Sequence, residues 1–366
     1  MERLDFDFDQ RIERAATIPA RCYTDPAMLE LEKRRIFCRT WQLVGRMEQV
    51  AEPGSYFTSD VVGEPVIIAR DREGRLRAFS NVCRHRAGPV AQGSGCRSSF
   101  QCGYHGWTYA LDGRLIGTPE FDGVEGFNQA EMGLVPVKVE TWEQFIFVNL
   151  DQGSPPLSAF LEDIPALTQH IDVSTMALVE RRDYVIECNW KVYVDNYAEG
   201  YHIPIIHPSL MREIDYRRYR TVTRRYYSLQ DAPIKSATGG EDAGRRYAPS
   251  EAQSEALYFW VFPNLMLNIY PDNLSTNLII PLGEGRTLTV FEWFFHRPQS
   301  AEVKEKISHT LRFSDEIQQE DLSICEAVQR GLRSSFYDRG RYSVRRENGV
   351  HHFHSLWNEF VRGAKE

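Results

Sequence analysis

The stretch that decides the fold runs over residues 81–115 and reads NVCRHRAGPVAQGSGCRSSFQCGYHGWTYALDGRL. It contains two short pairs, Cys83-x-His85 and Cys102-x2-His105, which are separated by sixteen residues. Several glycines between and after the pairs let the backbone turn tightly. Two loops of this kind, held side by side, would deliver two thiolates and two imidazoles to one point. We therefore expect a metal centre in this part of the chain.

The composition of the pairs favours iron and sulfide over zinc. A [2Fe–2S] cluster with two thiolates on one iron and two imidazoles on the other needs one cysteine and one histidine from each loop. A Cys2His2 zinc site is the alternative. Zinc fingers usually keep the cysteines and the histidines in separate pairs and place the histidines on a helix, and neither feature is present here.

The sequence around this stretch is typical of a small all-β domain, which we place at residues 41–152. Short apolar or alternating runs, among them SYFTSDV, EPVIIAR, LRAFSNV and QFIFVNL, are separated by Gly-containing turns. The segment DQGSPPLSAF (residues 151–160) is typical of a linker, because paired prolines disfavour regular structure. Residues 1–40, helical at about 26–38, are expected to form an N-terminal segment that packs on the second domain.

The second domain, residues 153–366, has a mixed pattern. A strand leading into a helix is expected at about 177–200, and two or three antiparallel strands are expected within 256–295. The clearest helix of the chain covers 301–335. The fold class is therefore α+β: a central antiparallel sheet with a long helix against it, in a helix-grip or START-like arrangement, follows the small all-β domain.

A second group of metal-ligand residues lies in the run NWKVYVDNYAEGYHIPIIHP, which contains Glu199, His202 and His207 as E-x2-H-x4-H. If a helix covers 190–202, then Asn196, Glu199 and His202 share one of its faces. A proline two residues later would end that helix, so His207 would approach from the following loop. Two imidazoles completed by one carboxylate form the facial triad that binds Fe(II) with positions left open.

The carboxylate is sought on the helix at 301–335, where Asp321 lies on the apolar stripe. An isolated buried carboxylate costs several kcal/mol, so it must be paired or bound to a metal. An ion pair with Arg330 or Arg333 is the alternative, and spacing alone does not decide between the two. Glu320 points about 100° away around the helix and is the weaker candidate.

Several of these motifs resemble one protein family. The stretches NVCRHRAGPVAQGSG and FQCGYHGWTYALDGRL resemble the cluster-binding loops of Rieske non-haem iron oxygenase alpha subunits. The E-x2-H-x4-H motif is similar to the D/E-x2-H-x4-H motif of that family. The runs QQEDLSICEAVQRGL, ALYFWVFPNLMLNIYP and HHFHSLW resemble the choline and carnitine monooxygenase branch. The resemblance covers nearly the whole chain.

The resemblance implies a ligand set for each of two centres. Cys83 and Cys102 are expected on the inner iron of a [2Fe–2S] cluster, and His85 and His105 on its outer iron. A separate mononuclear Fe(II) is expected on three residues: His202, His207 and Asp321. Many relatives carry aspartate where this chain has Glu199, the acid that connects a cluster histidine to a histidine of the mononuclear iron.

The same resemblance implies a terminal oxygenase that activates O2 reductively at the mononuclear iron. Electrons would come from NAD(P)H through a separate reductase or ferredoxin, since the chain has no G-x-G-x-x-G motif between a strand and a helix. The family forms homotrimers in which the cluster of one subunit serves the iron of its neighbour. Oxygen and a small molecule would be the substrates.

For the choline and carnitine branch, the expected substrate is a small quaternary ammonium compound that is hydroxylated or N-dealkylated. A trimethylammonium group offers no N–H donor, so aromatic faces must hold it by cation–π attraction. We expect four residues at this substrate: Asn196, Tyr197, Trp260 and Phe262. The alternative is an aromatic acid, hydroxylated on its ring or O-demethylated, which would require a buried Arg or Lys in the cavity.

Composition excludes some other classes. A net charge of −8 over 366 residues gives no electrostatic basis for binding nucleic acid. No apolar run approaches ~20 residues, so we expect no membrane span, and the charged N-terminus favours a cytoplasmic protein. Seven cysteines, an odd number, argue against a disulfide framework. A non-catalytic Rieske electron-transfer protein and a zinc-stabilised binding module are the rival interpretations.

Overall fold

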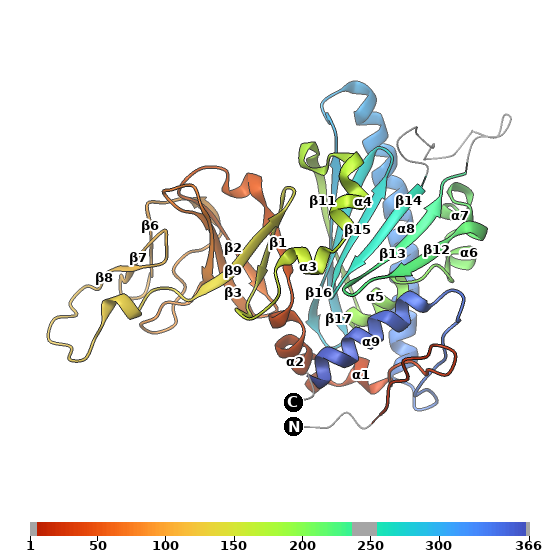
Figure 1. The fold of residues 1–366 in the computed structure, drawn as a ribbon, viewed down its shortest axis with the longest axis horizontal. Coiled ribbons are helices and arrows are strands. Elements are labelled where there is room, and N and C mark those ends of the chain that lie inside the picture. Colours follow the sequence, from red (N-terminus) through yellow and green to blue (C-terminus); the bar gives the residue numbers. More distant parts are fainter. Residues whose placement is uncertain (1–5, 236–254, 364–366) are drawn as a thin grey trace. The chain divides into compact units, whose positions relative to one another are not determined.

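The structure, a computed structural model, describes residues 6–235 and 255–363. It divides into two compact units (Figure 1). We call residues Phe37–Leu157 the β unit, and Met1–Ile36 together with Ser158–Glu366 the α+β unit. None of the helices in the described ranges combines the length and the hydrophobicity that a transmembrane segment needs.

The β unit consists of a seven-stranded and a three-stranded sheet, and all strand pairs in both are antiparallel. The larger sheet has the order β1-β10-β9-β4-β3-β2-β5, and the smaller has the order β6-β7-β8. The strands are β1 (Gln42–Arg46), β2 (Ser55–Val61), β3 (Glu64–Arg70), β4 (Leu76–Ser80), β5 (Ser94–Cys96), β6 (Ser99–Gln101), β7 (Thr108–Ala110), β8 (Leu115–Gly117), β9 (Pro136–Trp142) and β10 (Phe145–Asn149). The predicted all-β domain is thus present.

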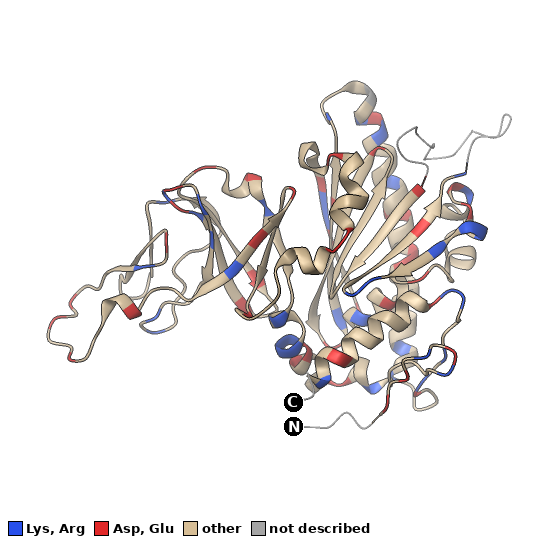
Figure 2. Ribbon diagram, in the orientation of Figure 1, with Lys and Arg blue, Asp and Glu red and all other residues tan. Residues whose placement is uncertain are grey.

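The α+β unit is built on one antiparallel sheet of seven strands in the order β11-β17-β16-β15-β14-β13-β12. Its strands are β11 (Ala177–Ile186), β12 (Arg220–Thr223), β13 (Tyr227–Pro233), β14 (Glu255–Val261), β15 (Leu265–Tyr270), β16 (Asn273–Gly283) and β17 (Arg286–Phe295). Strands β15 and β16 carry no charged side chain, and Figure 2 shows the centre of the sheet almost free of charge. Such β-branched, aromatic and amide-rich strands suit a sheet that is covered on its faces.

Nine α-helices are assigned in the described residues. They are α1 (Arg21–Thr24), α2 (Pro26–Arg35), α3 (Leu157–Leu161), α4 (Ile164–Thr168), α5 (Trp190–Tyr197), α6 (Ile203–Ile206), α7 (Leu210–Glu213), α8 (Ala301–Leu332) and α9 (Asn348–Arg362). Helix α8 begins at Ser300, whose side chain accepts a hydrogen bond from the backbone N–H of Val303 at 3.3 Å. Helix α5 begins in the same way at Asn189, which accepts from the N–H of Lys191.

The structure corrects three expectations about these elements. Residues 255–295 form four strands, not two or three. Helix α5 ends at Tyr197, so the expected helix over 190–202 is too long. The proline at 204, expected to end that helix, instead lies in the first turn of α6.

The long helix at 301–335 is confirmed as α8, but its most buried side chains are largely polar: Thr310, Gln318, Cys325 and Gln329. Val328 of the same helix is 45% exposed.

Candidate metal centres

The four cluster candidates lie on two loops of the β unit. Cys83 and His85 follow strand β4, and Cys102 and His105 lie between β6 and β7. Both cysteines are buried, whereas His105 is exposed and His85 is half-buried. The two imidazole rings have centroids 4.7 Å apart. Thiols in the core and imidazoles toward solvent suit a cluster whose histidine-bound iron faces the surface.

Neighbouring side chains shape these loops. The hydroxyl of Tyr109 lies 3.3 Å from Sγ of Cys83 and accepts a hydrogen bond from the backbone N–H of Arg84 at 2.9 Å. The ring of His85 stacks on Trp107 with centroids 4.9 Å apart. A Cβ on Gly88 would lie 3.0 Å from Sγ of Cys102, a tight contact that glycine avoids. The loops are thus held from the core side.

Electrostatics favours a neutral imidazole at His105. Partial desolvation, the neighbouring His85 and the guanidinium of Arg86 lower the pKa of His105 below its ordinary value. A neutral imidazole keeps a lone pair for a metal, so these residues fit the expected [2Fe–2S] cluster.

In the α+β unit, the structure brings together His202, His207 and Asp321. The two Nε2 atoms are 3.2 Å apart, and Oδ1 of Asp321 lies 3.0 Å from Nε2 of His207 and 3.8 Å from that of His202. One ligand atom from each residue lies within 4.8 Å of the others. His207 is buried, and the other two side chains are less than a fifth exposed. Two nitrogens and one carboxylate oxygen on one side of a common point fit a facial Fe(II) site.

Each of these ligand candidates has a hydrogen-bond partner behind it. Nδ1 of His202 lies 2.6 Å from Oε1 of Glu199. Nδ1 of His207 lies 2.6 Å from Oε2 of Glu320. The side-chain amide of Asn196 donates to Oδ1 of Asp321 at 2.7 Å. With a carboxylate at each Nδ1, the proton of a neutral imidazole stays there and both Nε2 lone pairs face the common point.

The acids around His207 also act on its charge. Burial lowers the pKa of His207, but its hydrogen bonds and Coulomb attraction with Asp321 and Glu320 outweigh this effect and raise the pKa above its ordinary value. The ion pair that the sequence offered as an alternative for Asp321 does not form with Arg333, whose guanidinium pairs with Glu284 at 3.0 Å. Asp321 faces the histidines instead.

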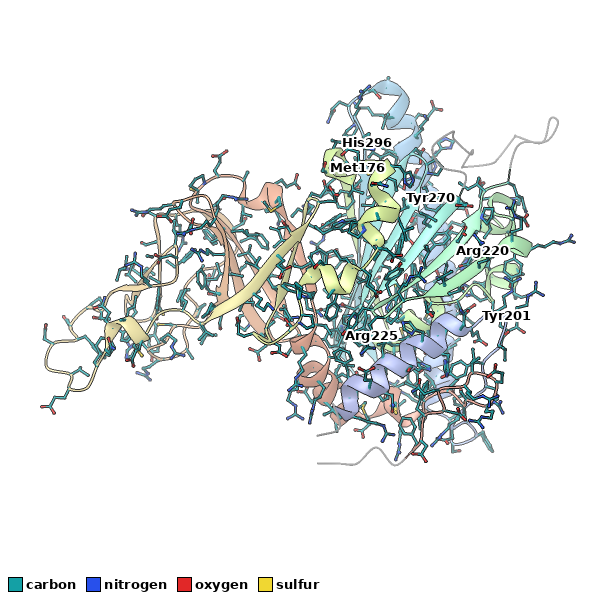
Figure 3. All side chains as sticks on the ribbon, in the orientation of Figure 1. Met176, Tyr201, Arg220, Arg225, Tyr270 and His296 are labelled. Carbon is teal, nitrogen blue, oxygen red and sulfur yellow. The ribbon has the colours of Figure 1, made fainter. Side chains whose placement is uncertain are left out.

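Local backbone structure explains how His202 reaches this point from outside a helix. After α5 ends, residues 198–202 turn against Tyr219, and a Cβ on Gly200 would lie 2.7 Å from its ring. The side chain of Glu199 accepts from the backbone N–H of Tyr201 and from that of His202. Glu199 and His202 therefore meet through a turn and not through a shared helix face. Tyr201 itself is 57% exposed beside α6 (Figure 3).

A cavity adjoins the two histidines and Asp321, and together with the solvent space at its mouth it has a volume of about 840 Å³. One wall is the face of α8 from Thr310 to Asp321, and α5 contributes Tyr193, Asn196 and Tyr197. Eight of the lining side chains are aromatic: Tyr193, Tyr197, Tyr219, Tyr258, Tyr270, Phe291, Trp293 and Phe313. Among the described residues, no Lys or Arg lines the cavity.

The sheet side of the cavity has a polar row that crosses five strands. Consecutive cross-strand partners are Gln230, Tyr258, Asn268, Ser275 and Trp293. The amide of Asn268 donates to Oγ of Ser275, and the oxygen of the same side chain lies 2.9 Å from the hydroxyl of Tyr197. Tyr270, labelled in Figure 3, lies at the end of β15 with its hydroxyl 3.0 Å from that of Tyr258.

The structure places only two of the four predicted substrate residues at this cavity. Asn196 and Tyr197 line it, but Trp260 and Phe262 do not. Trp260 packs edge-on against Phe353 of α9 with centroids 5.2 Å apart, and Phe262 packs against Phe360 of the same helix. These two aromatic residues lie beneath α9 and are part of the core.

Comparison with known proteins agrees with this arrangement. Residues 173–363 match the family model "Ring hydroxylating alpha subunit (catalytic domain)", and residues 40–128 match "Rieske [2Fe-2S] domain". The chain belongs to the Rieske oxygenase alpha subunits. As a Rieske oxygenase it carries a [2Fe–2S] cluster in the β unit and a mononuclear iron in the α+β unit. The predicted fold class and enzyme class are confirmed.

Three relatives indicate the branch of the family to which this Rieske oxygenase is similar. A chloroplastic choline monooxygenase of Arabidopsis thaliana is 38% identical over 97% of this chain and 86% of that protein. The carnitine monooxygenase oxygenase subunit of Acinetobacter baumannii is 30% identical over 97% and 98% of the two chains. A solved quaternary ammonium Rieske monooxygenase, described in terms of carnitine oxidation and inter-subunit electron transfer, has a TM-score of 0.84 at 30% identity and covers 98% of this chain and 99% of its own. The predicted branch is confirmed.

Proposed function

We propose that this chain is the terminal oxygenase component of a monooxygenase that hydroxylates or N-dealkylates a small quaternary ammonium compound of the choline, betaine or carnitine type. The observation that carries the proposal is the aromatic cavity, without a described Lys or Arg, next to His202, His207 and Asp321. Relatives named for choline and carnitine support the same substrate class.

The cavity chemistry suits a cation without N–H groups. Ring faces attract a quaternary ammonium by roughly 0.5–2 kcal/mol each, and the contribution grows when water is excluded. Tyr193, Tyr197 and Trp293 offer such rings within the same cavity as the metal candidates. An aromatic acid would bring a net negative charge into a space where the described side chains supply no cation. The carboxylate of betaine or carnitine is balanced by the ammonium of the same molecule.

We assign the ligands residue by residue. Cys83, Cys102, His85 and His105 would hold the [2Fe–2S] cluster, and His202, His207 and Asp321 would hold the mononuclear iron. When bound, these groups supply electron transfer and the reductive activation of O2. The protein supplies orientation: Asn196 holds Oδ1 of Asp321, and the carboxylates behind each histidine keep Nε2 free for the metal.

Glu199 is proposed as the connection between the two centres. Its Oε1 is paired with Nδ1 of His202, and its side chain is 11% exposed. We propose that the chain acts as a homotrimer in which His85 or His105 of a neighbouring copy donates a hydrogen bond to this carboxylate. Electrons would reach the oxygenase from NAD(P)H through a separate reductase or ferredoxin, as the naming of a carnitine monooxygenase "oxygenase subunit" supports.

A single turnover tests the proposal without the partner reductase. Anaerobically reduced protein is mixed with O2 and one compound at a time, and products are identified by mass spectrometry. The panel holds choline, glycine betaine, carnitine and several aromatic acids. Oxygenated or demethylated amine supports the proposal. A hydroxylated or demethylated aromatic acid would retain the iron chemistry and reject the quaternary ammonium substrate. The absence of product from every amine would also reject that substrate class.

A further inference from the structure

His207 is held at both ring nitrogens by two consecutive acids of helix α8. Nδ1 lies 2.6 Å from Oε2 of Glu320, and Nε2 lies 3.0 Å from Oδ1 of Asp321. The histidine side chain is 2% exposed and that of Glu320 is 28% exposed. The imidazole therefore bridges neighbouring positions of one helix, although their Cα–Cβ directions differ by about 100°.

The backbone at His207 does not hold the ring by itself. The residue follows α6, a helix of only four residues, and its N–H donates to the carbonyl of Ile203 at 3.0 Å. A proline follows at position 208, so the next residue has no N–H to donate. The orientation of the side chain must come from groups that contact the imidazole, and Glu320 is the one that contacts Nδ1.

We propose that Glu320 is a positioning residue for the mononuclear iron site: it accepts the Nδ1–H of His207 and thereby directs the Nε2 lone pair to the point shared with His202 and Asp321. The inference rests on the proposed iron ligands and adds a residue that acts through one of them, His207. Glu320 is not itself a ligand in this arrangement, because it contacts the nitrogen that faces away from the common point.

The chemistry of a neutral imidazole gives this contact its importance. The ring carries one N–H, which occupies Nδ1 or Nε2, and a metal can use only the nitrogen that has no proton. A carboxylate at Nδ1 selects the tautomer that leaves Nε2 free and makes that nitrogen a stronger donor. Removal of such a partner typically weakens metal binding by about 10–100-fold.

Each of the two histidines has its own acid at Nδ1, and the two acids differ in their position in the chain and in their other contacts. Glu199 comes from the same short segment as His202, three residues earlier, and is proposed to contact a neighbouring copy as well. Glu320 comes from another element and contacts His207 alone among the ligand candidates. The competing interpretation is that Glu320 is only a solvated charge on the surface of α8. The two interpretations predict different metal affinities.

The experiment compares Glu320→Ala, Glu320→Gln and Glu316→Gln in protein that keeps its [2Fe–2S] cluster. Glu316 is an exposed acid one turn earlier on α8, so its variant controls for the loss of charge. Alanine and glutamine are both good helix formers, so the variants retain α8. After removal of the mononuclear iron, Fe(II) is titrated anaerobically, and metal content is measured after equilibrium dialysis. The nitric oxide adduct is then compared by electron paramagnetic resonance with the cluster oxidised.

We expect Glu320→Ala to weaken Fe(II) binding by about 10–100-fold and to change the resonance line shape. Glu320→Gln should lie in between, because its amide oxygen still accepts from Nδ1–H, and Glu316→Gln should match the wild type. Equal affinity and an unchanged line shape in Glu320→Ala would overturn the inference. If instead Asp321→Ala binds Fe(II) as tightly as the wild type, the ligand assignment itself fails, and the inference fails with it.

Discussion

At the scale of single residues, Asp321 concentrates the contacts of the iron site on one oxygen. Its Oδ1 accepts from Asn196 at 2.7 Å and lies 3.0 Å from Nε2 of His207. We expect Asp321→Ala to lose the mononuclear iron while the visible absorption of the cluster persists, since the cluster candidates lie in the β unit. Metal and sulfide analysis with an absorption spectrum checks this, and full retention of the second iron would contradict it.

The carboxylate of Glu199 permits a separate test. We expect Glu199→Gln to keep both metal centres, because the amide oxygen still accepts from Nδ1 of His202, yet to lose coupled turnover with the reductase. The measurement combines metal content with product formed per electron delivered. Undiminished coupled activity in this variant would refute the proposed connection. Glu316→Gln is the charge control, because Glu316 is an exposed acid of α8 outside the iron site.

Residue types and short spacings were enough to identify the cysteines and histidines as ligand candidates, whereas Asp321 became one only through the resemblance to a family. The C-x-H, C-x2-H and E-x2-H-x4-H spacings are local, and the structure brings His202, His207 and Asp321 together as expected. Glu320 was given less weight because helix periodicity turns it away from Asp321, and no local pattern reveals that an imidazole reaches both. Alternation of side chains along a strand places Trp260 and Phe262 on the same face as Tyr258, which lines the cavity. Alternation does not show where along the strand the cavity ends.

At the scale of elements, a buried ion pair joins three helices of the α+β unit. Nζ of Lys191 on α5 lies 2.6 Å from Oε1 of Glu32 on α2, and both side chains are fully buried. The indole N–H groups of Trp190 and of Trp357 on α9 donate to the same carboxylate. The ammonium also lies 5.3 Å from the ring centroid of Tyr23. The helix that carries Asn196 is therefore fixed to the N-terminal segment and to α9.

We expect Glu32→Gln to destabilise the α+β unit by about 3–5 kcal/mol, because Lys191 then remains buried without a counter-ion. Glu30→Gln is the control on the same helix: it removes an exposed pair with Lys33, which should change the free energy of unfolding by less than about 1 kcal/mol. Denaturant unfolding followed by tryptophan fluorescence measures both. Equal stabilities would show that the buried charge is compensated in another way.

Helix α9 should make stability depend on pH through His352. Burial, with the nearby charges of Arg225 and His351, lowers the pKa of His352 to about 4 from 6.5. Between these two values the unfolded chain binds a proton that the folded chain does not, so stability falls as the pH falls from 6.5 to 4. The loss attributable to this residue is up to about 3 kcal/mol. His352→Gln should lose less stability than the wild type across this window, and parallel curves would contradict the assignment.

The elements themselves were predicted with uneven success, for physical reasons. Helix α8 was recognised by its length and period, but the face toward the sheet carries Thr310, Gln318 and Gln329, so the apolar stripe gave the wrong buried side chains. The strands at 255–295 follow one another through short turns, and hydrophobicity alone merges such runs. Strands β12 and β13 were not anticipated, because Arg220 and its neighbours are mostly polar.

At the scale of the whole molecule, the proposed trimer predicts complementation between two inactive chains. Cys83→Ser should lack the cluster but keep the iron site, and Asp321→Ala should have the opposite defect. If a cluster serves the neighbouring subunit, mixed oligomers combine an intact cluster with an intact iron site. Random 1:1 assembly should restore roughly a quarter of the wild-type turnover per chain over all closed trimers, and about a third in trimers that contain both chains. Co-expression with two affinity tags measures this, and no activity in purified mixed oligomers would indicate transfer within one chain.

Helix α8 also forms one wall of the cavity over several turns. Its cavity face presents Thr310, Phe313, Ser314, Ile317, Gln318 and Asp321 in one line. At 1.5 Å per residue, Thr310 lies roughly 16 Å along the axis from the metal-facing carboxylate. Each helical turn toward the N-terminus therefore adds a fixed distance from Asp321, whichever residues bind the metal. An enzyme of this design can accept longer or shorter molecules by exchanging side chains one to three turns away from Asp321, while the chemistry at its end stays the same.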